Sequence, residues 1–383
     1  MKAYCLNNIS KVALDTLKGN DKTVENINDA DSILVRSQDM HEMKLDKNIL
    51  AVARAGAGVN NIPLDDYAKE GVVVFNTPGA NANAVKELVL AGMLLASRDI
   101  IGGNKWVAEN KDDENIAKTA EKAKKAFAGN EIKGKTLGII GLGAIGILVA
   151  DAAIALGMKV IGYDPYMSIQ NAVKLNKAVK YVEKLDDVTK ESDFITIHVP
   201  ALPTTKGMIN KDVIAGMKDG VVILNFARDT LVNEADLLQA LESGKVKKYV
   251  VDFVTPATAA AKNVIATPHL GASTDEAEDN CALMAIDQLK DFIENGNVTN
   301  SVNYPATNAG PKAPNVVRIC ICHMNVPGMI AKFSDLVSKN GSNIITIVGK
   351  SRGDYSYAIL DIDKACDVSS LESMSGVLRV RVI

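Results

Sequence analysis

The sequence predicts an α/β protein with parallel sheets and a small module at its carboxyl terminus. Short runs of β-branched and apolar residues alternate with helical segments, several runs end in glycine-rich turns, and the pattern changes after residues 303–314, which are rich in Pro, Asn and Gly. Strands that alternate with helices form parallel sheets, whose loops at the strand carboxyl ends border a crevice. A chain of 383 residues is also long for one domain, so we expect two or three.

The composition disfavours several classes of partner. An apolar content of 47% is ordinary for a soluble protein, and a net charge of −3 offers no basic field for nucleic acid or a membrane surface. No secretory signal is visible, and glycines and charges interrupt the longest apolar span, residues 136–164. Five cysteines, an odd number, predict reduced thiols in the cytoplasm. No metal site is expected: Cys320 and Cys322 are interpreted as small core side chains, with a metal pair as the alternative.

The first domain is expected to begin with residues 1–88. Buried strands are predicted within SILVRS, AVARAGAGV and GVVVFNTPG. One long helix, NAVKELVLAGMLLASRDIIGGNKW, is predicted to lead into the next domain, followed by a charged helix, DDENIAKTAEKAKKAF, that faces solvent.

Residues 89–281 are predicted to form a second α/β unit. Its strands lie within KTLGIIGLGAIG, MKVIGYDP, DFITIHVP, GVVILNFAR, KYVVDFV and NVIATPH. Residues 282–302 are expected to return to the first domain, and residues 303–314 to form a linker. Residues 315–383 have the order βαββαβ. This unit is too small for a catalytic crevice, so we interpret it as a regulatory or assembly module.

A glycine-rich turn in the second unit predicts a dinucleotide site. The stretch GIIGLGAIG follows an apolar strand and opens an apolar helix in the spacing G-x-G-x-x-G. Glycines let the backbone approach a pyrophosphate, and a helix amino terminus offers unpaired N–H groups. The predicted cofactor-binding residues of this turn are Gly141, Gly143, Ala144, Ile145 and Gly146.

Asp164 lies 18 residues beyond Gly146, at the end of the next strand. There a carboxylate accepts hydrogen bonds from the adenosine ribose and repels a ribose phosphate, which favours NAD over NADP. The alternative is a turn aspartate that precedes Pro165.

Residues at other strand ends of this unit suit hydride chemistry. A crevice at these ends would gather Arg228, Asp252 and His269 beside a nicotinamide. Removing a hydride from a secondary alcohol requires a base for the hydroxyl proton, and a guanidinium can hold a carboxylate with two parallel hydrogen bonds. A surface ion pair for Arg228 and a satisfied turn histidine for His269 are the structural alternatives.

The motifs RAGAGVNNI, GLGAIG, YDP, HVP, NFAR and TPHLGAST resemble, in this order, those of the D-isomer-specific 2-hydroxyacid dehydrogenases. The resemblance implies a Rossmann-type doubly wound parallel sheet inserted in a flavodoxin-like substrate-binding domain. The stretch NCALMAIDQLKDFIENGNVTNSVNYP and the last module are similar to the branch of this family that ends in an ACT domain. For that branch the resemblance implies oxidation of 3-phospho-D-glycerate to 3-phosphohydroxypyruvate with NAD, the entry step of serine biosynthesis.

The resemblance also implies residue roles. Arg228 matches the substrate-binding arginine, His269 the acid/base, and Asp252 the aspartate that holds the nicotinamide carboxamide. The HVP motif adds three cofactor-binding residues: His198, Val199 and Pro200. Further substrate-binding candidates are the carboxylate cradle of Ala57, Gly58 and Val59, the phosphate candidates Arg36 and Arg54, and Asn81. Structural ion pairing is the alternative for both phosphate candidates.

Two positions depart from the family pattern. The glutamate expected five residues after Asp252, as partner of His269, is Ala257, and the usual glycine after Arg228 is Asp229. Without a carboxylate partner the imidazole should be less basic, unless water, a backbone carbonyl or a nearby acid such as Asp275 or Glu276 orients it. Loss of a tuning partner commonly costs a factor of ~10–10³ in rate.

The carboxyl-terminal module resembles ACT domains that bind L-serine. His323, Asn325 and Asn343 fall on the matching positions, with turn and capping polarity as the alternative. Because such domains pair between subunits, the resemblance implies a homodimer or homotetramer, with L-serine as an inhibitor.

Two rival functions stay open. One is another reductase of the family that acts on glyoxylate, hydroxypyruvate or a longer hydroxy acid; the presence of Arg36 and Arg54 weighs against it. The other is a non-catalytic sensor of NAD and an amino acid, suggested by Ala257 and Asp229.

Overall fold

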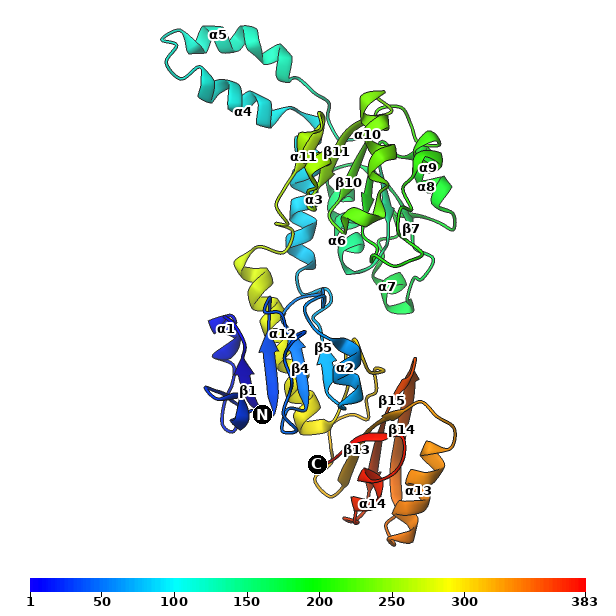
Figure 1. Ribbon diagram of the computed structural model, residues 1–383. Helices are drawn as coiled ribbons and strands as arrows, with labels where there is room; N and C mark the ends of the chain where they lie inside the picture. Colours follow the sequence, from blue (N-terminus) through cyan, green and yellow to red (C-terminus); the bar gives the residue numbers. More distant parts are fainter. The chain divides into compact units, whose positions relative to one another are not determined.

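The computed structural model describes all residues, 1–383, which form two compact units (Figure 1). One unit combines Met1–Asn81 with Asp275–Ile383, and the other is Ala82–Thr274. The sequence-based range for the inserted unit, 89–281, therefore begins and ends seven residues later in the chain than the observed unit. The predicted α/β class with parallel sheets and a separate small sheet is confirmed.

The inserted unit is built on seven parallel strands. These are Thr136–Ile140 (β6), Lys159–Tyr163 (β7), Lys180–Val182 (β8), Phe194–Ile197 (β9), Val221–Asn225 (β10), Val246–Val251 (β11) and Val264–Ala266 (β12). Their order in the sheet is β12-β11-β10-β9-β6-β7-β8. All residues of β9 and β10 are buried, and β10 is a nearly continuous run of Val, Ile and Leu, as expected for strands that are covered on both faces. From β6 the strands are added on one side as β7 and β8, and then on the other side from β9 to β12. The boundary between β6 and β9 is therefore the topological switch point, where doubly wound sheets bind ligands.

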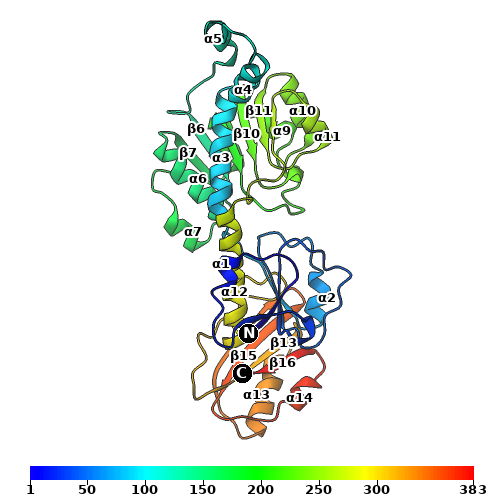
Figure 2. The ribbon, with the colours of Figure 1, turned by 90° about the vertical axis from the view of Figure 1, so that its left-hand side faces the viewer.

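Helices cover both faces of this sheet (Figure 2). Ala82–Ser97 (α3) and Ala144–Ala155 (α6) pack on one face. Leu185–Glu191 (α8), Lys211–Ala215 (α9) and Glu234–Glu242 (α10) pack on the other. Shorter helices are Ile169–Lys174 (α7), Pro256–Ala260 (α11) and Asp229–Leu231 (η3).

The single long helix predicted after residue 82 is wrong, because the chain breaks it in two. The first part, α3, ends at Ser97, and Asp99 caps the amino terminus of Ile100–Glu109 (α4) by accepting a hydrogen bond from the Gly102 amide. The charged segment forms Ile116–Ala123 (α5) and the 3₁₀ turn Lys124–Phe127 (η2), and none of their residues is buried.

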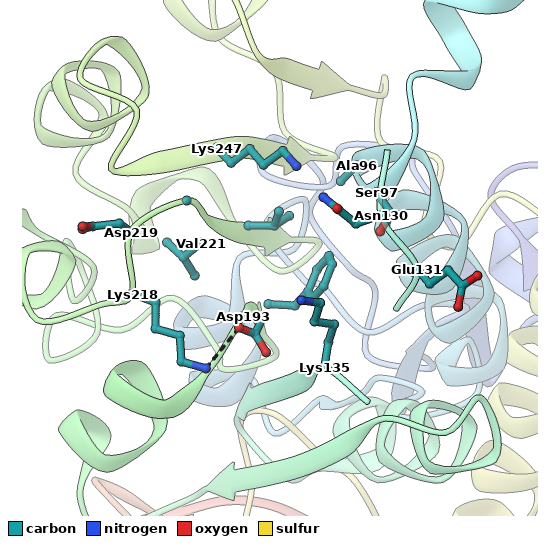
Figure 3. Close-up of a pocket in the computed structure, with 13 residues that line it drawn as sticks. Ala96, Ser97, Asn130, Glu131, Lys135, Asp193, Lys218, Asp219, Val221 and Lys247 are labelled. Atoms are coloured by element: carbon teal, nitrogen blue, oxygen red, sulfur yellow. Dashed lines mark hydrogen bonds and ion pairs between the residues drawn. The ribbon is translucent and has the colours of Figure 1, made fainter. Parts of the chain in front are cut away.

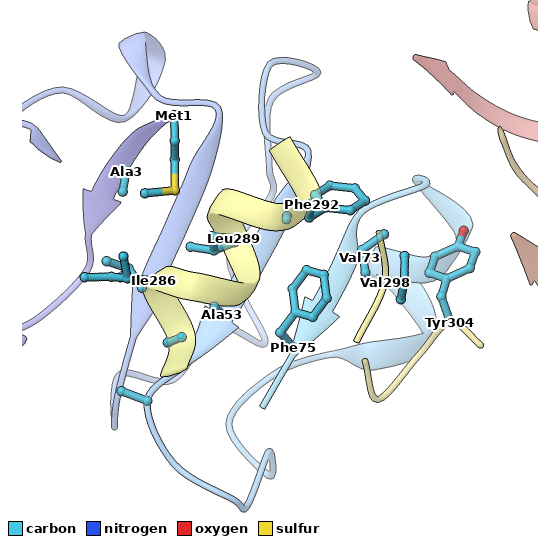
Figure 4. Close-up of a cluster of buried hydrophobic side chains, with 14 of the residues drawn as sticks. Met1, Ala3, Ala53, Val73, Phe75, Ile286, Leu289, Phe292, Val298 and Tyr304 are labelled. Carbon is cyan, nitrogen blue, oxygen red and sulfur yellow. The ribbon is translucent and has the colours of Figure 1, made fainter. Parts of the chain in front are cut away.

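The other unit begins with a five-stranded parallel sheet. Its strands are Lys2–Cys5 (β1), Lys22–Val24 (β2), Ser32–Val35 (β3), Ala51–Arg54 (β4) and Val73–Phe75 (β5), in the order β2-β1-β3-β4-β5. Lys11–Leu14 (α1) and the long helix Asp275–Asn295 (α12) cover one face, and Leu64–Lys69 (α2) contributes to the other, with Ile27–Asp29 (η1) as a short turn. Ile286, Leu289 and Phe292 of α12 reach the strand residues that include Ala3 and Phe75 (Figure 4).

The carboxyl-terminal module has the predicted βαββαβ order. It comprises Val317–Met324 (β13), Met329–Lys339 (α13), Ile344–Arg352 (β14), Tyr355–Ile362 (β15), Ser369–Glu372 (α14) and Val377–Val382 (β16). The antiparallel sheet runs β14-β15-β13-β16, and its Ile321 and Leu360 pack on Phe333 of α13. The opposite face, with Cys322 and Tyr357, joins the core of the five-stranded sheet.

Residues 303–314, expected as a linker, pack closely against this unit. Tyr304 is fully buried and donates a 2.6 Å hydrogen bond from its hydroxyl to the Ala68 carbonyl. Buried Arg318, which is paired with Asp361, donates to the Gly310 carbonyl at 2.8 Å. The segment is thus fixed by specific contacts that Pro, Asn and Gly content alone does not reveal.

No helix combines the length and apolar character needed to cross a membrane.

Candidate active site

The carboxyl-terminal ends of the seven parallel strands collect the predicted polar residues along one edge. In sheet order, His269 follows β12, Asp252 follows β11, Arg228 follows β10 and His198 follows β9, while Gly141 and Asp164 follow β6 and β7. Two groups are therefore adjacent: the residues suited to acid/base chemistry and the residues suited to a dinucleotide.

The glycine turn after β6 has the shape that a dinucleotide needs. Gly141 has φ +96°, and a Cβ there would lie 2.5 Å from the His198 carbonyl oxygen. A Cβ at Gly146 would lie 2.1 Å from the Gly141 carbonyl oxygen, whereas Gly143 faces open space. Two glycines are thus required for the turn and the third leaves room for a ligand, next to the helix residues Ala144 and Ile145.

Asp164 already organises the loop around this turn. Its Oδ2 accepts from the Leu142 amide at 3.0 Å, and its Oδ1 accepts from the Tyr166 amide at 2.9 Å. The carboxylate is half-buried beside the glycine turn, a position suited to hydroxyl donors.

His198 leaves one ring nitrogen without a partner. Its Nε2 lies 2.9 Å from the Thr196 hydroxyl, while its buried Nδ1 has no hydrogen bond. Burial lowers the pKa of His198 to about 3, so the ring is neutral at physiological pH. An unpartnered buried nitrogen beside the glycine turn fits a bound cofactor, with Val199 and Pro200 following in the same loop.

Asp252 holds the turn that carries His269. Its carboxylate accepts from the Leu270 amide (2.7 Å), the Gly271 amide (2.7 Å) and the Thr267 hydroxyl (2.7 Å), and only 1% of the residue is exposed. His269 itself has φ +59°, which is uncommon for a residue other than glycine. Three donors occupy this carboxylate, so Asp252 is a structural anchor for the turn, a role that the sequence did not predict.

Arg228 and His269 meet at one aromatic ring. The His269 ring centroid lies 4.5 Å from that of Phe253, and the Arg228 Cζ lies 5.1 Å from the same centroid. Arg228 also donates from Nη1 to the Ala227 carbonyl at 2.6 Å. Behind it, fully buried Asn225 donates to the Arg228 carbonyl at 2.8 Å and fixes the loop.

Ala257, at the position where the family pattern has a glutamate, lies in a regular, capped helix. Ala257 lies in the first turn of α11, which Thr255 caps, and the Thr255 hydroxyl donates to Glu234. Within residues 82–274 no carboxylate forms a hydrogen bond with the His269 ring, and Asp229 forms no ion pair with Arg228.

The substrate candidates of the other unit lie at the carboxyl ends of its own strands. Arg36 follows β3 and forms an ion pair with Glu278 of α12, and Arg54 ends β4 and donates from Nε to the Arg36 carbonyl at 3.0 Å. In the neighbouring loop, Ala57 is exposed, Gly58 and Val59 are half-buried, and the Asn76 amide donates to the Ala57 carbonyl at 2.7 Å. Asn81 is half-buried at the end of the segment.

A separate cavity of about 180 Å³ lies at the opposite edge of the seven-stranded sheet (Figure 3). Phe194 and Val221, which line it, begin β9 and β10, so the cavity opens at the amino ends of the strands. Lys218 pairs there with Asp193 at 3.0 Å. None of the predicted site residues lines this cavity.

The three effector candidates do not converge within one chain. His323 lies near the end of β13, with its Nδ1 2.8 Å from the Met324 carbonyl oxygen and its ring against Phe333. The Asn325 amide donates to the Gly353 carbonyl at 2.9 Å. Asn343 precedes β14, whose first residue aligns with Ile362 and hence with Val317 at the other end of β13.

Comparison with known proteins now identifies the family. Residues 90–271 match the family model described as D-isomer specific 2-hydroxyacid dehydrogenase, NAD binding domain. A hydroxypyruvate reductase of Thermotoga maritima is 38% identical over 281 residues, covering 70% of this chain and 87% of that protein. The chain belongs to the D-isomer specific 2-hydroxyacid dehydrogenase family.

Other members of this dehydrogenase family are similar over more of the chain. A D-3-phosphoglycerate dehydrogenase of Methanocaldococcus jannaschii is 36% identical over 78% of this chain, which spans only 57% of that longer protein. The NAD⁺-bound 3-phosphoglycerate dehydrogenase of Entamoeba histolytica has a TM-score of 0.62 and 28% identity, covering 79% of this chain and 98% of that one. The predicted cofactor, NAD, is confirmed by the family match.

The sequence did not single out two residues, Asn225 and Phe253, that contact the predicted site residues. Asn225 was visible in the NFAR motif, and a buried polar residue at the last position of a strand indicates that it holds the following loop. Phe253 follows Asp252 directly, but nothing in its spacing indicates that the His269 and Arg228 side chains both contact its ring.

Proposed function

We propose that the chain catalyses the NAD-dependent oxidation of 3-phospho-D-glycerate to 3-phosphohydroxypyruvate, the first step of L-serine biosynthesis. The observation that carries the proposal is the meeting of His269 and Arg228 at Phe253, on the strand edge that also bears the dinucleotide turn. The similarity to D-3-phosphoglycerate dehydrogenases supports the choice of substrate.

The residues divide the reaction between binding and proton transfer. Arg228 binds the substrate carboxylate through N–H groups that do not contact Ala227, and its charge polarises the neighbouring C2 oxygen. The neutral His269 imidazole accepts the C2 hydroxyl proton as the carbonyl forms, and returns it in the reverse direction. Bound NAD would supply the acceptor for the hydride that leaves C2.

The cofactor has suitable partners on this chain. The Gly141–Gly146 turn and the amino terminus of α6 suit the pyrophosphate, Asp164 suits the ribose hydroxyls, and the His198 loop offers an unpartnered ring nitrogen. Asp252 acts here by anchoring the His269 turn.

The phosphate of the substrate is assigned to Arg36 and Arg54. Both lie at the carboxyl ends of neighbouring strands, with the backbone of Ala57, Gly58 and Val59 and the Asn81 side chain as further substrate-binding groups. The ion pair between Arg36 and Glu278 supports the structural alternative for Arg36, so its contribution has to be measured.

NADH absorbance separates this proposal from its rivals. Purified protein should oxidise NADH at least ~10-fold more efficiently with 3-phosphohydroxypyruvate than with hydroxypyruvate, and His269→Gln should lower kcat by ~10²–10⁴-fold. Preference for hydroxypyruvate or glyoxylate would favour another reductase of the family. NADH binding without turnover of any 2-oxo acid would favour a sensor.

L-serine is retained as an effector of a homodimer or homotetramer. Because Asn343 and His323 lie at opposite ends of the module's sheet, only two chains paired in opposite directions could combine them in one site. We expect millimolar L-serine to inhibit the wild type and Asn343→Ala to abolish this inhibition. The mass of the particle in solution, measured alongside, gives the oligomeric state. A monomer that ignores serine would remove this part of the proposal.

A cytoplasmic location is also proposed. All five cysteines are free thiols, and three of them, Cys281, Cys320 and Cys322, are buried core residues. This is the condition expected of a protein kept in a reducing compartment.

A further inference from the structure

We propose that Phe253 is a positioning residue that takes the place of the missing carboxylate partner of His269. Its ring seats the His269 imidazole and the Arg228 guanidinium together. The inference rests on the proposed function, because these are the groups assigned to proton transfer and carboxylate binding.

The contacts with Phe253 are those expected between an aromatic ring and cationic or aromatic groups. The imidazole is tilted by 48° to the Phe253 ring, with centroids 4.5 Å apart. The guanidinium carbon lies 5.1 Å from the same centroid, within the range over which a ring attracts a cation. A single side chain therefore touches both groups whose mutual placement the reaction requires.

The backbone on both sides holds the Phe253 ring in place. Asp252, immediately before it, is buried and accepts three hydrogen bonds from the His269 turn. Two residues after it, Thr255 forms the capping box of α11 with Thr258. Phe253 is half-buried and packs against the core beneath β11. The ring is thus fixed relative to the turn that it orients.

An aromatic ring differs chemically from the expected glutamate. Its electron-rich face attracts the imidazolium and the guanidinium, yet it carries no charge that could neutralise Arg228 before substrate arrives. A ring also accepts no proton and selects no tautomer, so it orients the imidazole without sharing the proton. A carboxylate placed between the two groups would instead compete with the substrate carboxylate for Arg228.

The kinetic test compares Phe253→Leu with Phe253→Tyr. Leucine keeps an apolar side chain over the core and removes the ring, whereas tyrosine keeps the ring. We expect Phe253→Leu to lower kcat and raise KM for the 2-oxo acid, with kcat/KM falling ~10-fold or more, and Phe253→Tyr to stay within ~3-fold of wild type. Val254→Ala, in the same loop and 49% exposed, is the matched control and should leave both constants unchanged.

A spectroscopic test does not depend on activity. Only four histidines are present, so the His269 ring protons can be assigned by NMR with His269→Gln. The ring current of Phe253 should shift them in wild type and Phe253→Tyr, and Phe253→Leu should move them toward the position of a solvent-exposed histidine. NADH binding should be equal in all variants, because the glycine turn is untouched.

The outcomes separate this inference from the proposed function. His269 resonances that keep their wild-type positions in folded Phe253→Leu, or kcat/KM within ~2-fold of wild type, would overturn the positioning role even if the wild type is an active dehydrogenase. A loss in Phe253→Tyr equal to that in Phe253→Leu would overturn it as well. A wild type without turnover but with ring-shifted His269 would count against the proposed function alone.

Discussion

The two parallel sheets carry similar residues at their carboxyl edges but leave them in different states. On the seven-stranded sheet, the His198 Nδ1 has no partner and Gly143 faces open space. On the five-stranded sheet, Arg36 is paired with Glu278, and Arg54 donates to the Arg36 carbonyl. One edge is already arranged for a ligand, whereas the other satisfies its polar groups internally, so a ligand there must displace protein contacts before it gains its own.

The anchor of the preformed edge gives the largest expected effect. Asp252→Ala leaves the Leu270 and Gly271 amides and the Thr267 hydroxyl without their acceptor, so the His269 turn should lose its left-handed geometry. We expect kcat/KM to fall by ~10²-fold or more, close to the loss caused by His269→Gln. Asp252→Asn, which keeps an acceptor oxygen but not both, should fall between Asp252→Ala and wild type. A near-normal rate for Asp252→Ala would show that the turn is held by other contacts.

The sequence predicted more of the site at the edge of the seven-stranded sheet than at the edge of the five-stranded sheet, and the reason is physical. Spacing within one strand and its turn predicted Gly141, Asp164, Arg228 and His269, because the order of parallel strands aligns their ends. The ion pair of Arg36 with Glu278 was out of reach, since 242 positions separate these residues in the chain. The three donors on Asp252 were also hidden, because the carboxylate gives no local sign that backbone amides of a later turn will occupy it.

Restoring the missing carboxylate should have an effect that depends on the aromatic ring. In the Phe253→Leu background, Ala257→Glu should raise kcat/KM by about 10-fold, because it supplies an orienting partner that this variant lacks. In the wild-type background the gain should be under ~3-fold. Ala257→Gln, of similar size but without charge, is the control. Equal gains in both backgrounds would mean that Phe253 and the glutamate do not substitute for each other.

Releasing an arginine of the internally satisfied edge should change substrate preference modestly. Glu278→Gln removes the charge that pairs with Arg36, and this ion pair is about 40% exposed, so the gain is limited. We expect kcat/KM for 3-phosphohydroxypyruvate relative to hydroxypyruvate to rise by about 2–5-fold. Asp279→Asn, on the same helix turn and bonded to Ser10, is the matched control. An unchanged ratio would assign Arg36 to the fold and leave the phosphate to other groups.

The smallest expected effect is on stability, and it comes from His198. Burial lowers the pKa of His198 from 6.5 to about 3. On acidification, His198 therefore binds a proton near pH 6.5 in the unfolded chain but only near pH 3 in the folded chain. The stability contributed by the neutral ring is therefore complete above pH 6.5 and is lost as the pH falls below it, by at most about 1 kcal/mol per pH unit after allowance for partial solvent access. Between pH 7.5 and pH 5.5 the wild-type Tm should drop more than that of His198→Gln. His41→Gln, which removes an exposed imidazole from the other unit, should follow the wild type. Parallel curves for all three proteins would show that the buried His198 ring does not resist protonation, and that the difference between the two edges is smaller than their hydrogen bonds suggest.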